Sequence, residues 1–378
     1  MKKTLQTIVG AGALAWSAMA MTPAQAADDT IKIGVLHSLS GTMAISETTL
    51  KDTVLMLVDD INKKGGLLGK KVEAVVVDPA SDWPLFAEKA RELLEKDKVA
   101  YLASQANLPL PVLSLNYSEQ PSTEGLDLFQ FGLAPEDEAR SAATRAWDDG
   151  FRRMATLSTN DDWSQRANNA FKQQWEAMGG EIIGQEIVDQ PATVANQMGE
   201  LLKIRQSERR ASSIQRLLRY VKALPTPRQD LDALFLAATP LQARQIKPTL
   251  AFQYAASLPV YATSHSYTVD PSGSQNTDLD GLLVAETPWL LEHDDPLYQG
   301  VTSNWPQAAG PLGRIYAMGI DAQRVFNRLP QMRQYPETRI DGATGLLSLT
   351  QDGRIQRDLA WGQIQDGLLQ PAVVERDF

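Results

Sequence analysis

The chain has 378 residues, of which 43% are hydrophobic and 22% charged, and it carries a net charge of −10 and no cysteine. These values are ordinary for a globular protein of two domains, and an acidic chain without clustered Lys and Arg is a poor candidate for binding nucleic acid. The absence of cysteine excludes disulfides and thiol catalysis, and His37, His265 and His293 have no paired ligand spacing, so we expect no metal site and no cofactor.

The first 26 residues have the pattern of a secretory signal peptide. Lys2 and Lys3 form the charged end, residues 8–21 the apolar run, and residues 24–26 (AQA) the small-residue cleavage site. The apolar run is too short to span a bilayer, and no later stretch reaches about 18 apolar residues. We therefore expect a mature chain that begins at Ala27, has no membrane span, lacks a lipobox cysteine and is soluble in the periplasm.

The first third of the chain alternates between strand and helix patterns. Strands are predicted over residues 31–36, 71–77 and 99–102, with helices over 49–62 and 84–96 between them. This order predicts right-handed βαβ units and a parallel sheet. A crossover helix is then expected before the strand at 112–116, but Pro109 and Pro111 predict an extended linker instead, so one helix is missing.

The α/β alternation then resumes and predicts a second lobe. Helices are expected over residues 136–149, 163–178, 198–221, 240–254 and 313–329, strands over 154–157, 181–188, 233–237, 259–262 and 281–286, and a terminal hairpin over 345–364. We predict an α/β fold of two lobes, each a parallel sheet flanked by helices. Lobe 1 comprises residues 27–132 and 285–332, and lobe 2 comprises 133–284 and 333–378. A cleft between such lobes is the usual place for a small ligand.

Two stretches near the N-terminus carry a first family resemblance. They are residues 31–46 (IKIGVLHSLSGTMAIS) and 77–84 (VDPASDWP). From Asp29 to about Val99 the chain resembles periplasmic urea or short-chain-amide binding proteins of ABC transporters. The resemblance implies the type I periplasmic-binding fold, a small polar ligand and a transporter permease as partner. In that family a loop after the next strand grips the amide, and this chain lacks that loop.

A second resemblance covers the remainder of the chain. It is carried by FGLAPEDEAR (131–140), FLAATP (235–240), VYATSH (260–265), YAMGIDA (316–322) and DGATG (341–345). From about residue 110 to 378 the chain resembles the C-terminal domain of the outer-membrane lipoproteins that activate a bifunctional penicillin-binding protein. The resemblance implies the same type I fold, that synthase as partner, and action by protein contact. The family also carries a lipidated N-terminal cysteine and a helical-repeat domain, which this sequence lacks. The two matches fit a natural mosaic or an artificial recombinant equally.

Polar or aromatic residues that follow the predicted strands are candidate ligand groups in the cleft. In lobe 1 and lobe 2 together they are Ser38, Ser40, Gly41, Ser46, Trp83, Asn160, Asp161, Thr239 and Ser264. The alternative for most of them is structural, because Ser and Asp at these positions are also typical helix N-caps. Residues 203–228 hold eight cations against one acid, Glu208, which fits a docking surface for an acidic partner or glycan, or a solvated helix.

No enzymatic motif is present. The chain contains no S-x-x-K and no G-x-S-x-G, and residues 65–71 (GGLLGKK) do not complete a phosphate-binding loop. We therefore expect a non-enzymatic protein. The leading hypothesis is an activator-like module that regulates a peptidoglycan synthase through protein contact. The alternative is an ABC transporter substrate-binding protein for urea, short-chain amides or branched-chain amino acids. Because the amide-gripping loop is missing, we predict no measurable binding of urea or amides.

Overall fold

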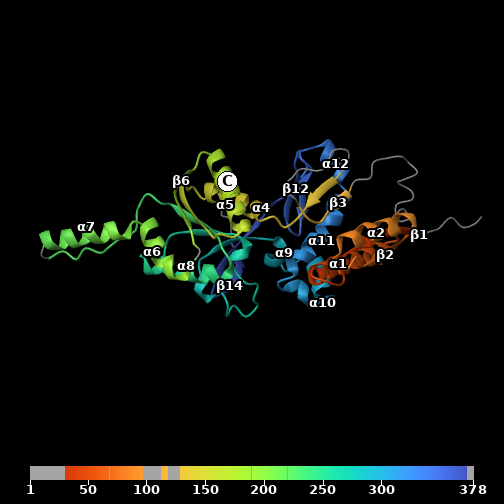
Figure 1. The fold of residues 1–378 in the computed structure, drawn as a ribbon, viewed down its shortest axis with the longest axis horizontal. Coiled ribbons are helices and arrows are strands. Elements are labelled where there is room, and N and C mark those ends of the chain that lie inside the picture. The colour runs from red at the N-terminus through yellow and green to blue at the C-terminus, as the bar shows by residue number, and fades with distance from the viewer. Residues whose placement is uncertain are drawn as a thin grey trace, which may run out of the picture.

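The computed structural model describes residues 30–372, except for residues 68, 97–111, 118–127, 189 and 219. Its strands form a two-stranded, a five-stranded and a seven-stranded sheet. The first two sheets belong to lobe 1 and the third to lobe 2, and the lobes lie side by side in an elongated molecule (Figure 1). The predicted two-lobed α/β fold is therefore confirmed.

The N-terminal unit of lobe 1 follows the predicted strand–helix order. Its elements are β1 (Thr30–Leu36), α1 (Ala44–Lys63), β2 (Lys71–Val77) and α2 (Trp83–Glu95). β1 and β2 pair in parallel, from Thr30 opposite Lys71 to Leu36 opposite Val77. The Asn62 side chain joins the end of α1 to β2 through two hydrogen bonds of 2.8 Å with the Val72 backbone. The strand expected at 99–102 and the linker up to residue 111 lie outside the described residues.

The five-stranded sheet of lobe 1 has the order β10-β11-β12-β4-β3. Its strands are β3 (Val112–Ser114), β4 (Leu128–Phe131), β10 (Ile340–Gly342), β11 (Gly345–Leu349) and β12 (Arg354–Asp358). The helices of this part are α9 (Pro288–Leu291), α10 (Pro296–Asn304), α11 (Gly313–Phe326) and α12 (Leu329–Gln334). Phe131, Leu347 and Met332 pack in its core together with Leu50 of α1, so the N-terminal unit docks on this sheet through α1.

The strand pairing corrects the expected lobe boundary. Residues 333–378 were all expected in lobe 2, but β12 pairs with β4 of lobe 1, and β11 and β10 continue the same sheet beyond β12. The chain crosses to lobe 2 only at Leu359, between β12 and the next strand. The expectation failed because the hairpin pattern of residues 345–358 shows that two strands pair with each other but does not show which sheet they join. β11 is also antiparallel to both β10 and β12, so this sheet is mixed rather than wholly parallel.

The seven-stranded sheet of lobe 2 has the order β14-β13-β9-β8-β7-β5-β6. Its strands are β5 (Arg153–Ser158), β6 (Glu181–Ile187), β7 (Ala233–Ala237), β8 (Val260–Ala262), β9 (Leu283–Glu286), β13 (Ala360–Gln365) and β14 (Leu368–Pro371). The first five are parallel to one another, whereas β13 and β14 are antiparallel additions at one edge.

Helices cover both faces of the lobe 2 sheet. They are α4 (Pro135–Asp148) and α5 (Asp162–Ala177) on one face, and α6 (Pro191–Leu201) and α8 (Pro240–Phe252) on the other. Successive residues of β7 point to opposite faces, so Phe235 packs under α5 while Leu234 and Leu236 pack under α6 and α8. This two-sided burial explains the continuous apolar run of the strand.

The single helix predicted over residues 198–221 is two helices. α6 ends at Leu201 and α7 (Ile204–Leu217) begins three residues later, because Lys203 adopts a left-handed conformation with φ 56°. α7 projects away from the body of lobe 2 at one end of the molecule (Figure 1). None of the helices within the described ranges is long and apolar enough to cross a membrane.

The N-terminal unit is expected to be the least protected part of the protein. Among its described residues, the buried apolar side chains are Val35, Leu50, Val58, Val72 and Leu93, and only Leu50 of these joins one of the large core clusters. In an element with few buried contacts, the backbone hydrogen bonds open by local unfolding at a low free-energy cost. We therefore expect the amides of β1 and β2 to exchange with deuterium well before those of β5 and β7. Equal protection of the four strands in hydrogen-exchange mass spectrometry would contradict this prediction.

Candidate functional site

The hydroxyl groups predicted at the end of the first strand are engaged in internal bonds. Ser38 is fully buried, its hydroxyl accepts a hydrogen bond from the Ser81 N–H at 3.0 Å, and its own N–H donates to the Glu47 carboxylate. The Ser40 hydroxyl donates to Asp78 Oδ2 at 2.8 Å. The two loops after β1 and β2 are thereby joined to each other, which leaves these hydroxyls less available to a ligand.

Asp78 is the centre of this pair of loops, and sequence reasoning did not select it. Its Oδ1 accepts hydrogen bonds from the Ala80 N–H at 2.7 Å and the Leu39 N–H at 2.9 Å. These bonds hold the pKa of Asp78 below its ordinary value, and the bond from the Ala80 N–H has the largest effect. Gly41 has a φ of 81°, and a Cβ there would lie 2.8 Å from Ser81 Oγ, so glycine is required by the loop itself.

Two further lobe 1 candidates occupy helix starts. Ser46 lies in the first turn of α1, where its hydroxyl donates to the Met43 carbonyl at 3.1 Å. Trp83 is the first residue of α2, and its side chain lies outside the described part of the structure. The neighbouring Asp82 is the N-cap of α2, because its Oδ1 accepts from the Leu85 N–H at 2.9 Å.

The lobe 2 candidates Asn160, Asp161 and Thr239 follow β5 and β7 as expected. Asn160 is exposed, and Asp161 holds the N-cap position of α5 but accepts from the Thr159 hydroxyl at 2.8 Å instead of capping the helix. The N–H and hydroxyl of Thr239 donate to Gln242 Oε1 at 3.0 and 2.6 Å. Thr239 and Gln242 therefore stabilise the start of α8. No hydrogen bond or ion pair among the described residues joins them to the Ser38 and Ser40 loop.

Ser264 belongs to a buried cluster around Glu138 of α4. Glu138 accepts from the Ser264 N–H at 2.7 Å and from its hydroxyl at 2.9 Å. His265 Nδ1 lies 3.7 Å from the same carboxylate, and its ring stacks on Trp163 with centroids 4.6 Å apart. Burial acts to raise the pKa of Glu138, but His265 and the nearby Arg357 and Arg314 hold it below the ordinary value. An ionised carboxylate therefore orders the loop after β8.

The depressed pKa of Glu138 predicts a contribution to acid stability. Ionised Glu138 stabilises the fold at pH values above about 4.5, the ordinary pKa of the group, and this stabilisation is lost as the pH falls through the lower folded-state pKa. We expect Glu138→Gln to lower the free energy of unfolding more at pH 7 than at pH 3, measured by urea unfolding. An equal loss of unfolding free energy at pH 7 and at pH 3 would contradict the prediction.

An ion pair between a partly exposed arginine and a buried carboxylate joins the two lobes beside this cluster. Arg314 of α11, in lobe 1, reaches across to Glu286 at the end of β9, in lobe 2, with Nη2 2.5 Å from Oε2 and Nε 3.0 Å from Oε1. The Glu286 side chain is fully buried and also accepts from the Tyr267 hydroxyl at 2.6 Å and the Thr287 N–H at 2.7 Å. Each carboxylate oxygen therefore accepts from at least two donors, and these hydrogen bonds offset the free-energy cost of burying the charge.

A second set of polar contacts fastens α4 of lobe 2 to β12 of lobe 1. Asp137 Oδ2 accepts from the Arg357 N–H at 3.3 Å, and Arg357 Nη2 donates to the Ala134 carbonyl at 3.1 Å. The Ser141 hydroxyl donates to Asp358 Oδ1 at 3.1 Å. We call this set of contacts between α4 and β12 the inter-lobe seam. Both of its ends lie next to segments where the chain crosses between lobes, so the contacts restrict how far one lobe can rotate relative to the other.

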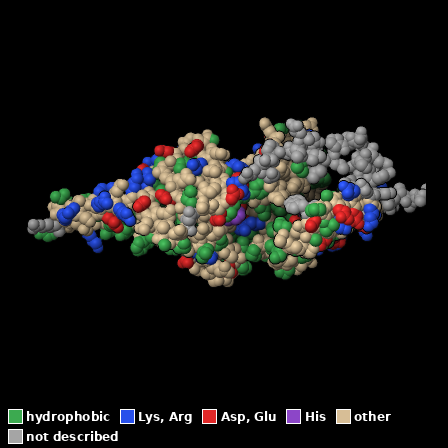
Figure 2. Space-filling view, in the orientation of Figure 1, with side chains coloured by type: hydrophobic (Ala, Val, Ile, Leu, Met, Phe, Trp, Pro, Cys, Tyr) green, Lys and Arg blue, Asp and Glu red, His purple; other side chains and the backbone are tan. Residues whose placement is uncertain are grey.

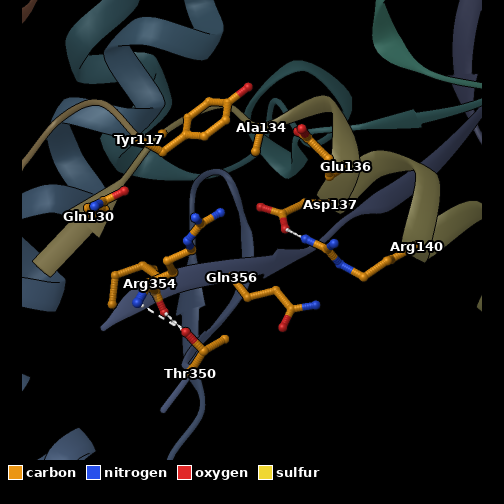
Figure 3. A pocket seen from close by; sticks show the side chains of 11 residues that line it. Tyr117, Gln130, Ala134, Glu136, Asp137, Arg140, Thr350, Arg354 and Gln356 are labelled. Atoms are coloured by element: carbon orange, nitrogen blue, oxygen red, sulfur yellow. Dashed lines mark hydrogen bonds and ion pairs between the residues drawn. The ribbon is translucent and has the colours of Figure 1, made fainter. Parts of the chain in front are cut away.

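A small pocket opens at the same seam. It has a volume of about 90 Å³, and its walls come from β4, α4 and β12. In Figure 3 Asp137 and Arg140 of α4 lie opposite Arg354 and Gln356 of β12, and Asp137 bonds to Arg140 at 2.5 Å. Polar groups of both signs therefore meet where the lobes join. We take this inter-lobe seam, with the Arg314–Glu286 and Glu138–Ser264 contacts, as the candidate functional site.

Of the residues predicted from the sequence, only Ser264 belongs to this seam. Sequence reasoning missed Glu138, Glu286 and Arg314, although Glu138 lies within the motif of residues 131–140. The available signal was the cluster of charged residues at 136–140 directly after the apolar start of the motif, because buried charges are retained only with partners.

Comparison with known proteins supports both resemblances. The model of the LppC lipoprotein family matches residues 92–367, and that of a periplasmic binding protein domain matches residues 31–104. The penicillin-binding protein activator LpoA of Enterobacter sp. (strain 638) is 31% identical over 303 residues, which are 76% of this chain and 40% of that protein. The chain spans less than half the length of the curated relatives it matches.

Solved structures agree with the family assignment. The C-domain of LpoA from Haemophilus influenzae, a regulator of PBP1A, superposes with a TM-score of 0.65 and 26% identity over 90% of this chain and all of that chain. A protein of Chromobacterium violaceum described as a branched-chain amino acid ABC transporter gives a TM-score of 0.62 and 24% identity over 88% of this chain and 99% of its own, which shows the fold alone. Because the family match covers well over half of its length, the chain belongs to the LppC lipoprotein family.

Proposed function

We propose that this protein regulates a penicillin-binding protein through direct contact and catalyses no reaction itself. The observation that carries the proposal is the match to the LpoA C-domain, a regulator of PBP1A, whose whole length is covered by this chain. The partner is a bifunctional synthase, and the site of action is the periplasm, to which the predicted signal peptide directs the chain.

The geometry of the seam supports action by contact rather than by ligand capture. A solute receptor needs convergent polar groups that are available to a ligand and lobes that can close on it. Here Ser38, Ser40 and Ser264 engage their hydroxyls internally, and Arg314–Glu286 holds the lobes together. A rigid module of this kind acts through its outer surface.

The alternative function is that of a substrate-binding protein for an ABC transporter. It is favoured by the match of residues 31–104 to a periplasmic binding protein domain, which includes the loops after β1 and β2. The ligand would be urea, a short-chain amide or a branched-chain amino acid, delivered to a permease. A true ligand at 100 times its Kd would stabilise the fold by about 2.7 kcal/mol. A saturable rise of several degrees in melting temperature with any of these compounds would favour the alternative.

The activator proposal is tested with the purified mature chain and a purified bifunctional penicillin-binding protein. We expect saturable binding by biolayer interferometry and faster formation of cross-linked glycan by the synthase. The matched control is Lys63→Glu/Lys64→Glu, which reverses two exposed charges on α1, outside the segment that matches the LppC family. This variant is expected to bind and activate as the parent does. Failure of the parent to bind the synthase would overturn the proposal.

A further inference from the structure

Residues 203–218 and 220–228 form an arm on lobe 2, which we call the lobe 2 arm. α7 leads outward and the chain returns alongside it. Gln215 Nε2 donates to the Ala223 carbonyl at 2.9 Å, and the Thr226 N–H donates to Ser207 Oγ at 2.8 Å. At the base, the Arg228 N–H donates to the Leu202 carbonyl at 3.0 Å. The arm is therefore a hairpin fixed along its length and fastened to the body, and it carries its free end away from the rest of the protein (Figure 1).

The free end of the lobe 2 arm exposes large apolar side chains. Leu217 is 82% exposed, Tyr220 is fully exposed and Leu224 is 65% exposed, and they are joined by the exposed Leu218 and Val221. A soluble monomer seldom leaves so many large apolar side chains together on one projection, and such patches mark surfaces that bind something. Because they crown a projecting tip, they suit insertion into a soft apolar phase better than docking on a flat protein surface.

Cations lie along the arm, and Lys222 lies in the chain between the apolar Val221 and Leu224. Figure 2 shows Lys and Arg side chains distributed over this end of the molecule, although the chain as a whole has a net charge of −10. Among the described residues, Arg209, Arg210 and Lys222 form no ion pair, and Glu208 is the single acid of the segment. The arm therefore presents an unneutralised positive surface next to an apolar tip.

We propose that the lobe 2 arm binds an anionic phospholipid bilayer. The tip places Leu217, Leu218 and Tyr220 in the interfacial region, and the cations contact the head groups. Apolar side chains next to Lys and Arg are the features of helices that lie on membranes, and Tyr is favoured at the interface between water and lipid. Each cation near such a surface strengthens binding about fivefold at moderate ionic strength. This inference is independent of the proposed function, since it involves no penicillin-binding protein.

A single labelled site tests the proposed insertion. Because the chain has no cysteine, Leu218→Cys gives a unique position for an environment-sensitive fluorophore. We expect a blue shift with vesicles of phosphatidylglycerol and phosphatidylethanolamine, a weak response with phosphatidylcholine alone, and reversal in 0.5 M salt. The same label at Phe252→Cys, an exposed residue of α8 in the same lobe, is expected to show no shift.

Unlabelled variants separate the apolar and the charged contributions. We expect Leu217→Ser/Leu218→Ser/Tyr220→Ser to weaken co-sedimentation with the anionic vesicles at least tenfold, and Arg209→Glu/Arg210→Glu to weaken it by a similar factor. Leu241→Ser/Phe252→Ser, which alters two exposed apolar residues of α8, is the matched control and should sediment like the parent. Unchanged melting temperatures will show that all variants fold.

Two results would overturn the proposal. One is equal sedimentation of the parent and the tip variant. The other is no binding of the parent to anionic vesicles; loss of binding to a penicillin-binding protein by the tip variant would then assign the arm to a protein groove. Failure to bind the synthase with intact vesicle binding would contradict only the proposed function.

Discussion

Replacement of Arg314 with methionine is expected to lower the free energy of unfolding by about 3–5 kcal/mol, because it leaves a buried carboxylate without its charged partner. The side chain of Glu286 is completely buried, and Arg314 is its only cationic contact among the described residues. The remaining donors, from Tyr267 and Thr287, do not supply a positive charge. Guanidinium unfolding followed by far-ultraviolet circular dichroism measures the loss.

A matched pair on the surface provides the control for Arg314. Arg205 lies 3.7 Å from Glu200, with both side chains more than 60% exposed, so Arg205→Met should cost less than about 1 kcal/mol. Combining Arg314→Met with Glu286→Gln removes the stranded charge and should recover part of the loss. If Arg314→Met is no more destabilising than Arg205→Met, the ion pair does not fasten the lobes.

Replacement of Phe235 with alanine is expected to destabilise lobe 2 by about 3–5 kcal/mol, because it removes a fully buried ring and leaves a cavity. Phe235 stacks on Phe171 of α5 with centroids 4.2 Å apart, and Phe171 in turn stacks on Trp175 at 5.9 Å. The ring thus fixes the contact between β7 and α5. The same unfolding experiment measures the effect, and near-ultraviolet circular dichroism reports the loosened aromatic stack.

Phe252 offers a control of the same residue type. It ends α8 and is 77% exposed, so Phe252→Ala should change the free energy of unfolding by no more than about 0.5 kcal/mol. Similar losses for Phe235→Ala and Phe252→Ala would mean that the aromatic stack contributes little to the stability of lobe 2.

The local elements were predictable from the sequence because their patterns are local. The strands at 31–36 and 71–77, and helices such as α5 and α11, follow from apolar spacing and stop signals. The break at Lys203 was not predictable, because a left-handed lysine leaves no trace in apolar periodicity. The choice of sheet for β10–β12 depends on contacts with β4, more than 200 residues earlier in the chain.

The candidate site was less predictable than the fold. Positions after strands were correctly identified as polar, but whether a hydroxyl is available depends on its partner. Ser264 bonds to Glu138, 126 residues away, and Ser40 bonds to Asp78, 38 residues away. Similarly, nothing near Arg314 in the sequence indicates its ion pair with Glu286. Such pairs are tertiary contacts between residues far apart in the chain, and no local pattern in a single sequence indicates them.

The late position of the strands that complete both sheets sets the order in which the protein can mature. Three of the five strands in one sheet and two of the seven in the other come from residues 340–371, the final described stretch of the chain. A growing polypeptide therefore has open edges in both halves until residues 340–371 have been synthesised. The halves then reach their native state nearly together, since one short run of residues supplies the last strands to each, with only Leu359 between β12 of one sheet and β13 of the other. A nascent chain arrested before residue 340 would remain sensitive to proteases in both halves.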